Sequence, residues 1–158
     1  MSEPVVRPLT LTDGPAARAL ARSVYGGTRY LTRTLELVEF ALRGDDPDCL
    51  GLVGVSIASI HGLLLHGPVA GASGVIKVHA LIASAPKVLT SMLSVLRDVI
   101  SVADARMIVC ELPGGAEHSV AAAALIKNGF TREGSVSGFF AEDIALGLFV
   151  WRRSEHRA

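Results

Sequence analysis

Apolar residues recur along this chain with two different periods, and the change from one to the other predicts the order of its elements. Spacings of three and four residues, bounded by proline and glycine, predict helices over residues 14–27, 32–44, 86–102 and 117–130. Alternating or short continuous apolar runs predict strands over residues 5–13, 49–57, 59–69, 73–84, 103–113, 132–140 and 144–153. The predicted order is strand, two helices, three strands, helix, strand, helix and two strands.

The helix predicted over residues 86–102 has the clearest core-facing stripe. Its apolar positions recur every three or four residues, at Leu89, Met92, Leu93, Leu96, Val99 and Ile100. The last predicted helix ends with Gly129 at the position after the helix and Phe130 packing back onto it. The three strands before residue 84 predict an antiparallel meander, and the last two strands predict a hairpin. Together these elements predict one α+β domain over residues 1–158.

The composition is unusually apolar for a chain of this length. Of its 158 residues 50% are apolar and 19% are charged, and residues 49–76 contain no Asp, Glu, Lys or Arg. That stretch is long enough to span a bilayer, but its histidines, proline and glycines favour buried strands. The surplus of apolar residues predicts a further buried surface, most simply in a homodimer.

Charge and cysteine content argue against several function classes. The formal net charge is zero, so no general field attracts nucleic acid or an anionic membrane. Cys49 and Cys110 have neither a disulfide nor a zinc-ligand spacing, which favours a reducing cytoplasm and predicts no metal site. The N-terminus "MSEPVVRPLT" has no signal-peptide pattern, so we expect a cytoplasmic protein. Arg152, Arg153 and Arg157 are interpreted as a solvated tail, with a small anion site as the alternative.

Two local patterns and the element order resemble a known family. "AAAALIKNGF" (residues 121–130), followed by a predicted hairpin, resembles the last helix and closing strands of the GNAT superfamily of acyl-CoA-dependent N-acyltransferases. "VRPLTLTD" (residues 6–13) and the helix after it resemble that family's first strand and helix. The resemblance covers nearly the whole chain and rests on the order and spacing of these elements.

The resemblance implies a fold, a cofactor and an activity. The fold is a central mixed, mostly antiparallel sheet of about seven strands, flanked by about four helices and splayed between its fourth and fifth strands. Acetyl-CoA or another acyl-CoA would lie in the splay against the fourth strand, at Leu81 and Ile82. Its pyrophosphate would lie on the next turn, at Ser84, Lys87 and Val88. The implied activity is acyl transfer to an amine of a small molecule or a protein.

The predicted phosphate-binding turn departs from the family pattern. The family motif has the form Q/R-x-x-G-x-G/A, whereas "ASAPKVLTS" contains no glycine and Pro86 lacks an N–H. A helix N-terminus remains, with Ser84 as its cap and Lys87 as a phosphate partner. The alternative is an ordinary helix start with Lys87 in solvent.

The positions for proton transfer also differ. The family's tyrosine acid falls at Leu125, which cannot donate a proton, and its helix-capping Asn falls near His118. His118 could cap the helix or titrate near neutrality, although a solvent-exposed histidine is the commoner outcome at a helix start. The family's carboxylate base is missing from "VIKVHALIA", where Lys77 and His79 share one face.

His79 is therefore the predicted general base, because its unperturbed pKa suits that role, and Glu111 on the next strand is the second choice. The alternatives are a histidine packed on the sheet and a surface carboxylate. Cys110 is interpreted as a buried structural thiol. His61 and His66 are five residues apart on one strand, which predicts opposite faces and argues against a shared metal.

The acceptor substrate is not identified by the sequence. In the family it binds between the first two helices and near the last hairpin, a region that here contains Tyr25, Arg29, Tyr30 and Arg33. Two functional hypotheses follow. The protein is either a divergent N-acyltransferase, or a catalytically degenerate GNAT-fold binding or regulatory protein that no longer uses acetyl-CoA in the usual way.

Overall fold

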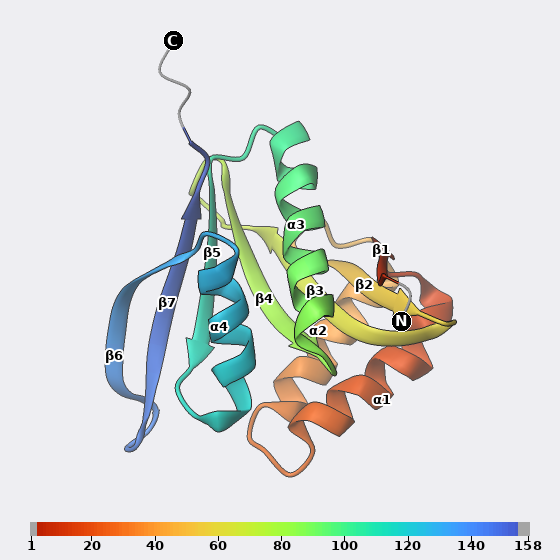
Figure 1. Ribbon diagram of the computed structural model, residues 1–158, viewed down its shortest axis with the longest axis horizontal. Helices are drawn as coiled ribbons and strands as arrows, with labels where there is room; N and C mark the ends of the chain where they lie inside the picture. The colour runs from red at the N-terminus through yellow and green to blue at the C-terminus, as the bar shows by residue number, and fades with distance from the viewer. Residues whose placement is uncertain (1–2, 155–158) are drawn as a thin grey trace.

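The computed structural model describes residues 3–154, which form a seven-stranded sheet with helices on both faces (Figure 1). The strands are β1 (Val5–Pro8), β2 (Leu50–Ser56), β3 (Ser59–Pro68), β4 (Val75–Ala83), β5 (Met107–Pro113), β6 (Thr131–Ala141) and β7 (Ile144–Arg152). The helices are α1 (Gly14–Tyr25), α2 (Leu31–Arg43), α3 (Pro86–Val102) and α4 (Ser119–Lys127), with short 3₁₀ turns η1 (Leu11–Asp13) and η2 (Ala116–His118). The predicted α+β class and order of elements are confirmed.

The sheet has the order β1-β2-β3-β4-β5-β7-β6. All neighbouring strands are antiparallel except β4 and β5, which are parallel and are connected through α3. The predicted meander is β2-β3-β4, and the predicted hairpin is β6-β7. Phe130 is buried after Gly129, whose φ of 88° uses the left-handed region open to glycine, as the sequence predicts.

Two hydrophobic cores lie on opposite faces of the sheet. In Figure 1, α3 and α4 lie in front of the sheet and α2 lies behind it. The α3–α4 core includes Leu64, Val78 and Cys110, and the α1–α2 core includes Leu63 and Ile82. Period-two alternation places successive strand residues in different cores, so the sheet is buried on both faces where helices cover it.

The stripe predicted for α3 is confirmed except at Val99. Its other five members are at most 2% exposed, whereas Val99 is 44% exposed. Val99 lies at the flank of the stripe, where the helix surface turns away from the sheet. The sequence prediction was wrong for this residue because spacing alone does not fix the width of the buried face.

Two glycines allow the start of α3 to approach the sheet closely. Gly54 in β2 lies opposite Gly62 in β3, and a Cβ built at either would lie 2.4 Å from Cγ1 of Val88. No real side-chain carbon tolerates that distance, so only glycine fits at both positions under this helix. The Val88 side chain occupies the space that they leave, and this contact sets the height of α3 above β2 and β3.

The uncharged residues 49–76 form β2, β3 and the first residues of β4. Within the described part of the chain, no helix is long and apolar enough to cross a membrane.

The arginines at the end of β7 are not a solvated tail, because acidic side chains hold them. Arg152 pairs with Glu133 of β6, and Arg153 pairs with Asp104 after α3. Arg157, the third member of that predicted group, lies outside the described residues.

Candidate active site

The central feature of the site is a split in the sheet between β4 and β5. The two strands pair from Val75↔Met107 to Val78↔Cys110. Beyond those pairs β4 continues to Ala83 and β5 to Pro113, but β4 then pairs with β3 alone. We call the region between residues 79–83 and 111–113 the β4–β5 split. On its β4 side, backbone N–H and C=O groups face away from β3 and are available to another chain or a ligand.

A β-bulge at His79 begins the split. Leu65 of β3 pairs with Ala80, whereas the next residue, His66, pairs with Val78, so His79 is the extra residue in β4. A bulge bends its strand and increases the local twist, which turns β4 away from β5 immediately after their last pair. The predicted splay between the fourth and fifth strands is therefore confirmed, and the bulge is its local cause.

His79 itself is half-buried and anchored at one nitrogen. Its Nε2 lies 3.1 Å from the carbonyl oxygen of Asp48, so Nε2 carries the proton and donates. Burial lowers the pKa of His79, with a smaller contribution from the charge on Lys77. The neutral form is therefore favoured at neutral pH, and the lone pair of Nδ1 is the group that could accept a proton.

Glu111 lies across the start of the split from Lys77. The Lys77 ammonium donates to Glu111 Oε2 at 2.9 Å, and both side chains are partly exposed. An exposed pair of this kind adds little stability, but it holds the carboxylate beside the point where the strands part. Both predicted bases thus lie near this point, and their catalytic roles remain predictions.

The predicted pantetheine-binding residues offer backbone groups and not side chains. Leu81 and Ile82 are each 2% exposed, with Leu81 in the α3–α4 core and Ile82 in the α1–α2 core. Both side chains are therefore occupied by packing. A ligand in the split would contact these residues through the open backbone edge of β4.

The turn into α3 differs from the one expected. The residue before the helix is Ala85, which provides no side-chain cap, while the Ser84 hydroxyl donates to the carbonyl oxygen of His61 on β3. Ser84 as a helix cap was therefore wrong, because its side chain bonds across the sheet. Val88 also has little to offer a ligand: its side chain is 5% exposed and its amide donates to Ala85. Lys87 is exposed beside this turn, where its charge can reach a phosphate.

An aromatic cluster links the helix layer over β4 to the turn after β5. It consists of Tyr25, Tyr30, His118 and Phe140. The Tyr25 hydroxyl lies 3.2 Å from His118 Nε2, and the rings of Tyr30 and His118 meet edge to face at 4.8 Å. Tyr25 ends α1, which packs on β3 and β4, and His118 ends η2, the short turn that follows β5. The Tyr25–His118 hydrogen bond therefore bridges the β4–β5 split.

Tyr25 and His118 are buried and Tyr30 is half-buried, which changes the chemistry of these three side chains. His118 is only 4% exposed, so the expectation of a solvent-exposed histidine was wrong; the tyrosines cover it from a segment some ninety residues earlier in the chain. Burial lowers the pKa of His118 and raises the pKa of Tyr25 and of Tyr30. All three side chains are therefore neutral near pH 7.

Two polar atoms of the cluster have no hydrogen-bond partner among the described residues. They are His118 Nδ1 and the Tyr30 hydroxyl, both fully buried. Most buried polar atoms are bonded, so two such atoms on touching rings mark a place where a water or a ligand belongs. Sequence reasoning missed this pair because nothing local in the sequence connects residues 30 and 118.

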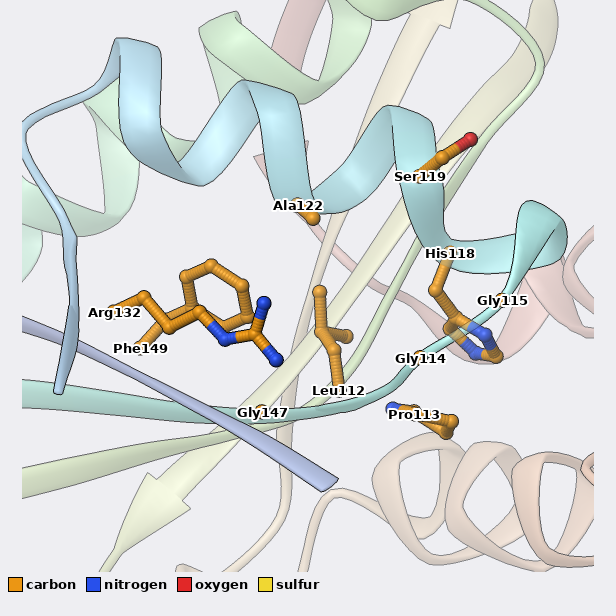
Figure 2. A pocket seen from close by; sticks show the side chains of 10 residues that line it. All are labelled: Leu112, Pro113, Gly114, Gly115, His118, Ser119, Ala122, Arg132, Gly147 and Phe149. Atoms are coloured by element: carbon orange, nitrogen blue, oxygen red, sulfur yellow. The ribbon is translucent and has the colours of Figure 1, made fainter. Parts of the chain in front are cut away.

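A pocket of about 200 Å³ lies beside the cluster, between α4 and the strands β5 and β7. Figure 2 shows the Arg132 guanidinium reaching beneath Ala122 of α4, with His118 and Gly114 at the opposite end. A Cβ built at Gly147 would lie 3.2 Å from Phe149 Cε2, so the missing side chain there leaves room for the Phe149 ring that lines the pocket. His118 thus contacts Tyr25 at the split and lines this pocket as well.

The remaining sequence candidates play no chemical part in this site. Leu125 is fully buried in the α3–α4 core, and Cys110 is 1% exposed, with burial raising the pKa of its thiol to about 12. Cys110 is therefore a structural thiol, as predicted. Among the described residues, no group of three or more His, Cys, Asp or Glu side chains could hold a metal ion.

The sheet order, the split and the helix layers can be compared with solved structures. No family model and no curated protein matches this sequence. The structure, however, superposes with a TM-score of 0.82 on a GNAT-family protein from Desulfovibrio desulfuricans, covering 94% of this chain and 98% of that one at 15% identity. The chain has the GNAT fold.

Two further solved structures with the GNAT fold cover nearly the whole chain. A protein from Salmonella typhimurium, solved with acetyl-CoA as its cofactor, superposes with a TM-score of 0.78 over 99% of this chain and 98% of its own, at 13% identity. The ribosomal-protein-alanine N-acetyltransferase of Brucella melitensis superposes with a TM-score of 0.73 over 94% and 99% of the two chains, at 16% identity. At these identities the similarity establishes the fold, and substrate assignments have to rest on the residues themselves.

The residues at the split of this GNAT fold fit one part of an acyl-CoA better than the other. The open β4 edge suits the pantetheine arm, because amide groups there can pair with an extended ligand as with a strand. The α3 turn suits the pyrophosphate less well, since Pro86 has no N–H and the Val88 amide is already bonded. Phosphate binding here would depend mainly on the Lys87 side chain and on the amides of residues 85 and 87.

Proposed function

We propose that this protein is an N-acyltransferase that holds an acyl-CoA in the β4–β5 split and transfers its acyl group to an amine. The observation that carries the proposal is the backbone of β4 after the His79 bulge, which faces the split unpaired while α3 begins three residues after the strand ends. Residues 79–83 offer an extended edge of roughly 13 Å at 3.3 Å per residue. That edge leads from Lys87 at one end to His79 at the other.

The reaction needs a held thioester and a base. When bound, the acyl-CoA supplies an activated acyl group: the amine nitrogen bonds to the carbonyl carbon, the carbon–sulfur bond breaks, and CoA leaves as a thiolate. The proton of the amine passes to a base, for which His79 Nδ1 is the first candidate and the Glu111 carboxylate the second. Holding the two reactants together supplies much of the rate enhancement even without a strong acid.

The solved relatives support the proposal by what their own structures contain. One was solved with acetyl-CoA, and another is named for acetyl transfer to an alanine of a ribosomal protein. The α1–α2 connection with Tyr25 and Tyr30 and the β6–β7 hairpin with Phe140 meet over the split. The amine acceptor would enter there, where Arg29 donates to the carbonyl oxygen of Phe140.

A second candidate is a binding protein that has lost the acyl-CoA reaction. The α3 turn favours it, because Pro86 and the bonded Val88 amide leave few donors for a pyrophosphate. Leu125, where the family's acid would stand, favours it too.

Calorimetry with acetyl-CoA and with CoA, followed by thiol release over a panel of amines, separates the two candidates. The transferase proposal expects micromolar to millimolar binding and turnover with at least one amine. Lys87→Ala should weaken acetyl-CoA binding by about tenfold, as expected for one charge-assisted contact to a phosphate. Lys127→Ala, which removes an exposed lysine at the far end of α4, is the matched control and should bind normally. No binding at millimolar acetyl-CoA would reject the transferase and leave the binding protein.

A further inference from the structure

His118 is a buried titratable side chain beside the split that neither proposed base role uses. Its ring contacts Tyr25 and Tyr30 and also lines the pocket between α4 and the strands β5 and β7. The charge on the neighbouring Glu117 raises the pKa of His118, against the larger lowering by burial. Its Nδ1 is buried and has no hydrogen-bond partner among the described residues.

The hydrogen bond to Tyr25 settles which nitrogen carries the proton. Tyr25 keeps its phenolic proton at neutral pH, and His118 Nε2 is the one hydrogen-bond partner of its hydroxyl among the described residues. If Tyr25 donates to Nε2, only one polar group of the pair is left unbonded, the N–H of Nδ1. If Nε2 donates instead, both the phenolic proton and the lone pair of Nδ1 are left unbonded. Because each buried unbonded group is costly, the first arrangement is favoured, and Nδ1 of neutral His118 is a donor without an acceptor.

The Tyr30 hydroxyl is a second donor, on the ring next to that of His118. It is buried and unpartnered, and its ring meets the His118 ring edge to face at 4.8 Å. Two neutral donors without acceptors suit an oxygen atom that is uncharged before the reaction and gains negative charge during it. A cation would find no counter-charge on these two atoms.

We propose that His118 Nδ1–H, assisted by the Tyr30 hydroxyl, donates a hydrogen bond to the carbonyl oxygen of the acyl thioester bound in the β4–β5 split. This inference rests on the proposed acyl-transfer function and adds a catalytic residue to it. His118 keeps its proton throughout and stabilises the charge that develops on the oxygen as the amine attacks. Tyr25 is a positioning residue, because its hydroxyl fixes the tautomer that presents the donor.

Nuclear magnetic resonance on the wild-type protein tests the contact without requiring turnover. The imidazole ¹⁵N resonances of His118 should show protonated Nδ1 in the free protein. Saturating acetyl-CoA should shift the Nδ1–H resonance, whereas CoA, which has no acyl carbonyl, should leave it nearly unchanged. Equal shifts with both ligands, or no shift with either bound, would overturn the inference.

Two substitutions at residue 118 separate donation to the ligand from the bond to Tyr25. In His118→Asn the amide nitrogen can replace Nδ1 as donor, while the bond to Tyr25 is lost. In His118→Gln the amide oxygen can accept from Tyr25, while the donor at the Nδ1 position is lost. In calorimetry, His118→Asn should keep the wild-type ratio of the affinities for acetyl-CoA and CoA. In His118→Gln this ratio should fall about fivefold.

The opposite order of the two variants would show that His118 serves only to bind Tyr25 and would overturn the inference alone. Tyr30→Phe should reduce the preference in the same direction as His118→Gln. If the wild-type protein binds neither acetyl-CoA nor CoA, the proposed function fails and this inference fails with it. Binding of both ligands without any preference rejects only the role of His118.

Discussion

Adding one methyl group at Gly62 should lower the stability of the protein, because that position sets how closely α3 approaches the sheet. A Cβ at residue 62 would lie 2.4 Å from Val88 Cγ1 and 2.7 Å from Met92 Cε. Val88 and Met92 are buried in the α3–α4 core, so neither has open space into which it can retreat. The methyl group therefore either displaces the start of α3 or forces Val88 out of its rotamer.

The size of the effect follows from those contacts. Overpacking a closed core costs about 1–3 kcal/mol, and replacing glycine by alanine returns about 0.4–1 kcal/mol through the unfolded chain. Gly62→Ala should thus lower the free energy of unfolding by about 1–2 kcal/mol. In a chain of this length that corresponds to a fall in melting temperature of about 2–8 °C.

Urea denaturation of a double-mutant cycle tests the cause as well as the size. Val88→Ala alone removes two buried methyl groups and should cost roughly 1.5–2.5 kcal/mol. In the double variant the new methyl group occupies part of the vacated space, so the two effects should couple favourably by about 1 kcal/mol. Gly134→Ala is the matched control, because its nearest contact would be Leu148 Cβ at an ordinary 3.9 Å. Additive effects of the first two substitutions would refute the packing explanation.

Two further predictions concern buried charge. His66 is 6% exposed and burial lowers its pKa to about 4, so the unfolded chain binds more protons than the folded one between pH 4 and about 6.5. The free energy of unfolding should therefore fall as the pH falls through that window, and His66 should account for up to about 3 kcal/mol of the loss. In urea denaturation, His66→Gln should flatten the dependence of the free energy of unfolding on pH. An unchanged slope in this variant would contradict the prediction. Asp13 accepts from both terminal nitrogens of Arg7 at 2.8 Å, which holds the pKa of this carboxyl well below its usual range. The ionised Asp13 contributes its full share to the free energy of unfolding above about pH 3.9, and this contribution is lost as the pH falls below that value. Asp13→Asn should therefore cost about 2 kcal/mol at pH 7 and much less at pH 2. An equal cost at the two pH values would argue against the ion pair.

The sequence predicted the elements well because each has a strong local signal. The α3 stripe, the Gly129–Phe130 helix end and the period-two runs of β2 and β3 depend on neighbours a few residues away. The order of these elements then limited the sheet to few arrangements, which is why the fold could be predicted without any closely similar sequence.

The details of the site could not be predicted in the same way. The His79 bulge is visible only from the register against β3, although the change of phase between Val78 and Leu81 is a weak signal of it. The burial of His118 depends on Tyr25, 93 residues away, and on Tyr30, which local periodicity does not connect to it. Ser84 satisfies the local pattern of a helix cap but is bonded to His61 instead. In each case a tertiary contact overrides a local preference.

The proposed acyl transfer depends on a ligand lying along the open edge of β4. Amide hydrogen exchange with and without saturating acetyl-CoA measures that contact directly. We predict slower exchange for amides among residues 79–83 and at the start of α3, with exchange in β2 and β7 unchanged. Binding of acetyl-CoA without slower exchange in β4, or no binding at millimolar concentration, would contradict it.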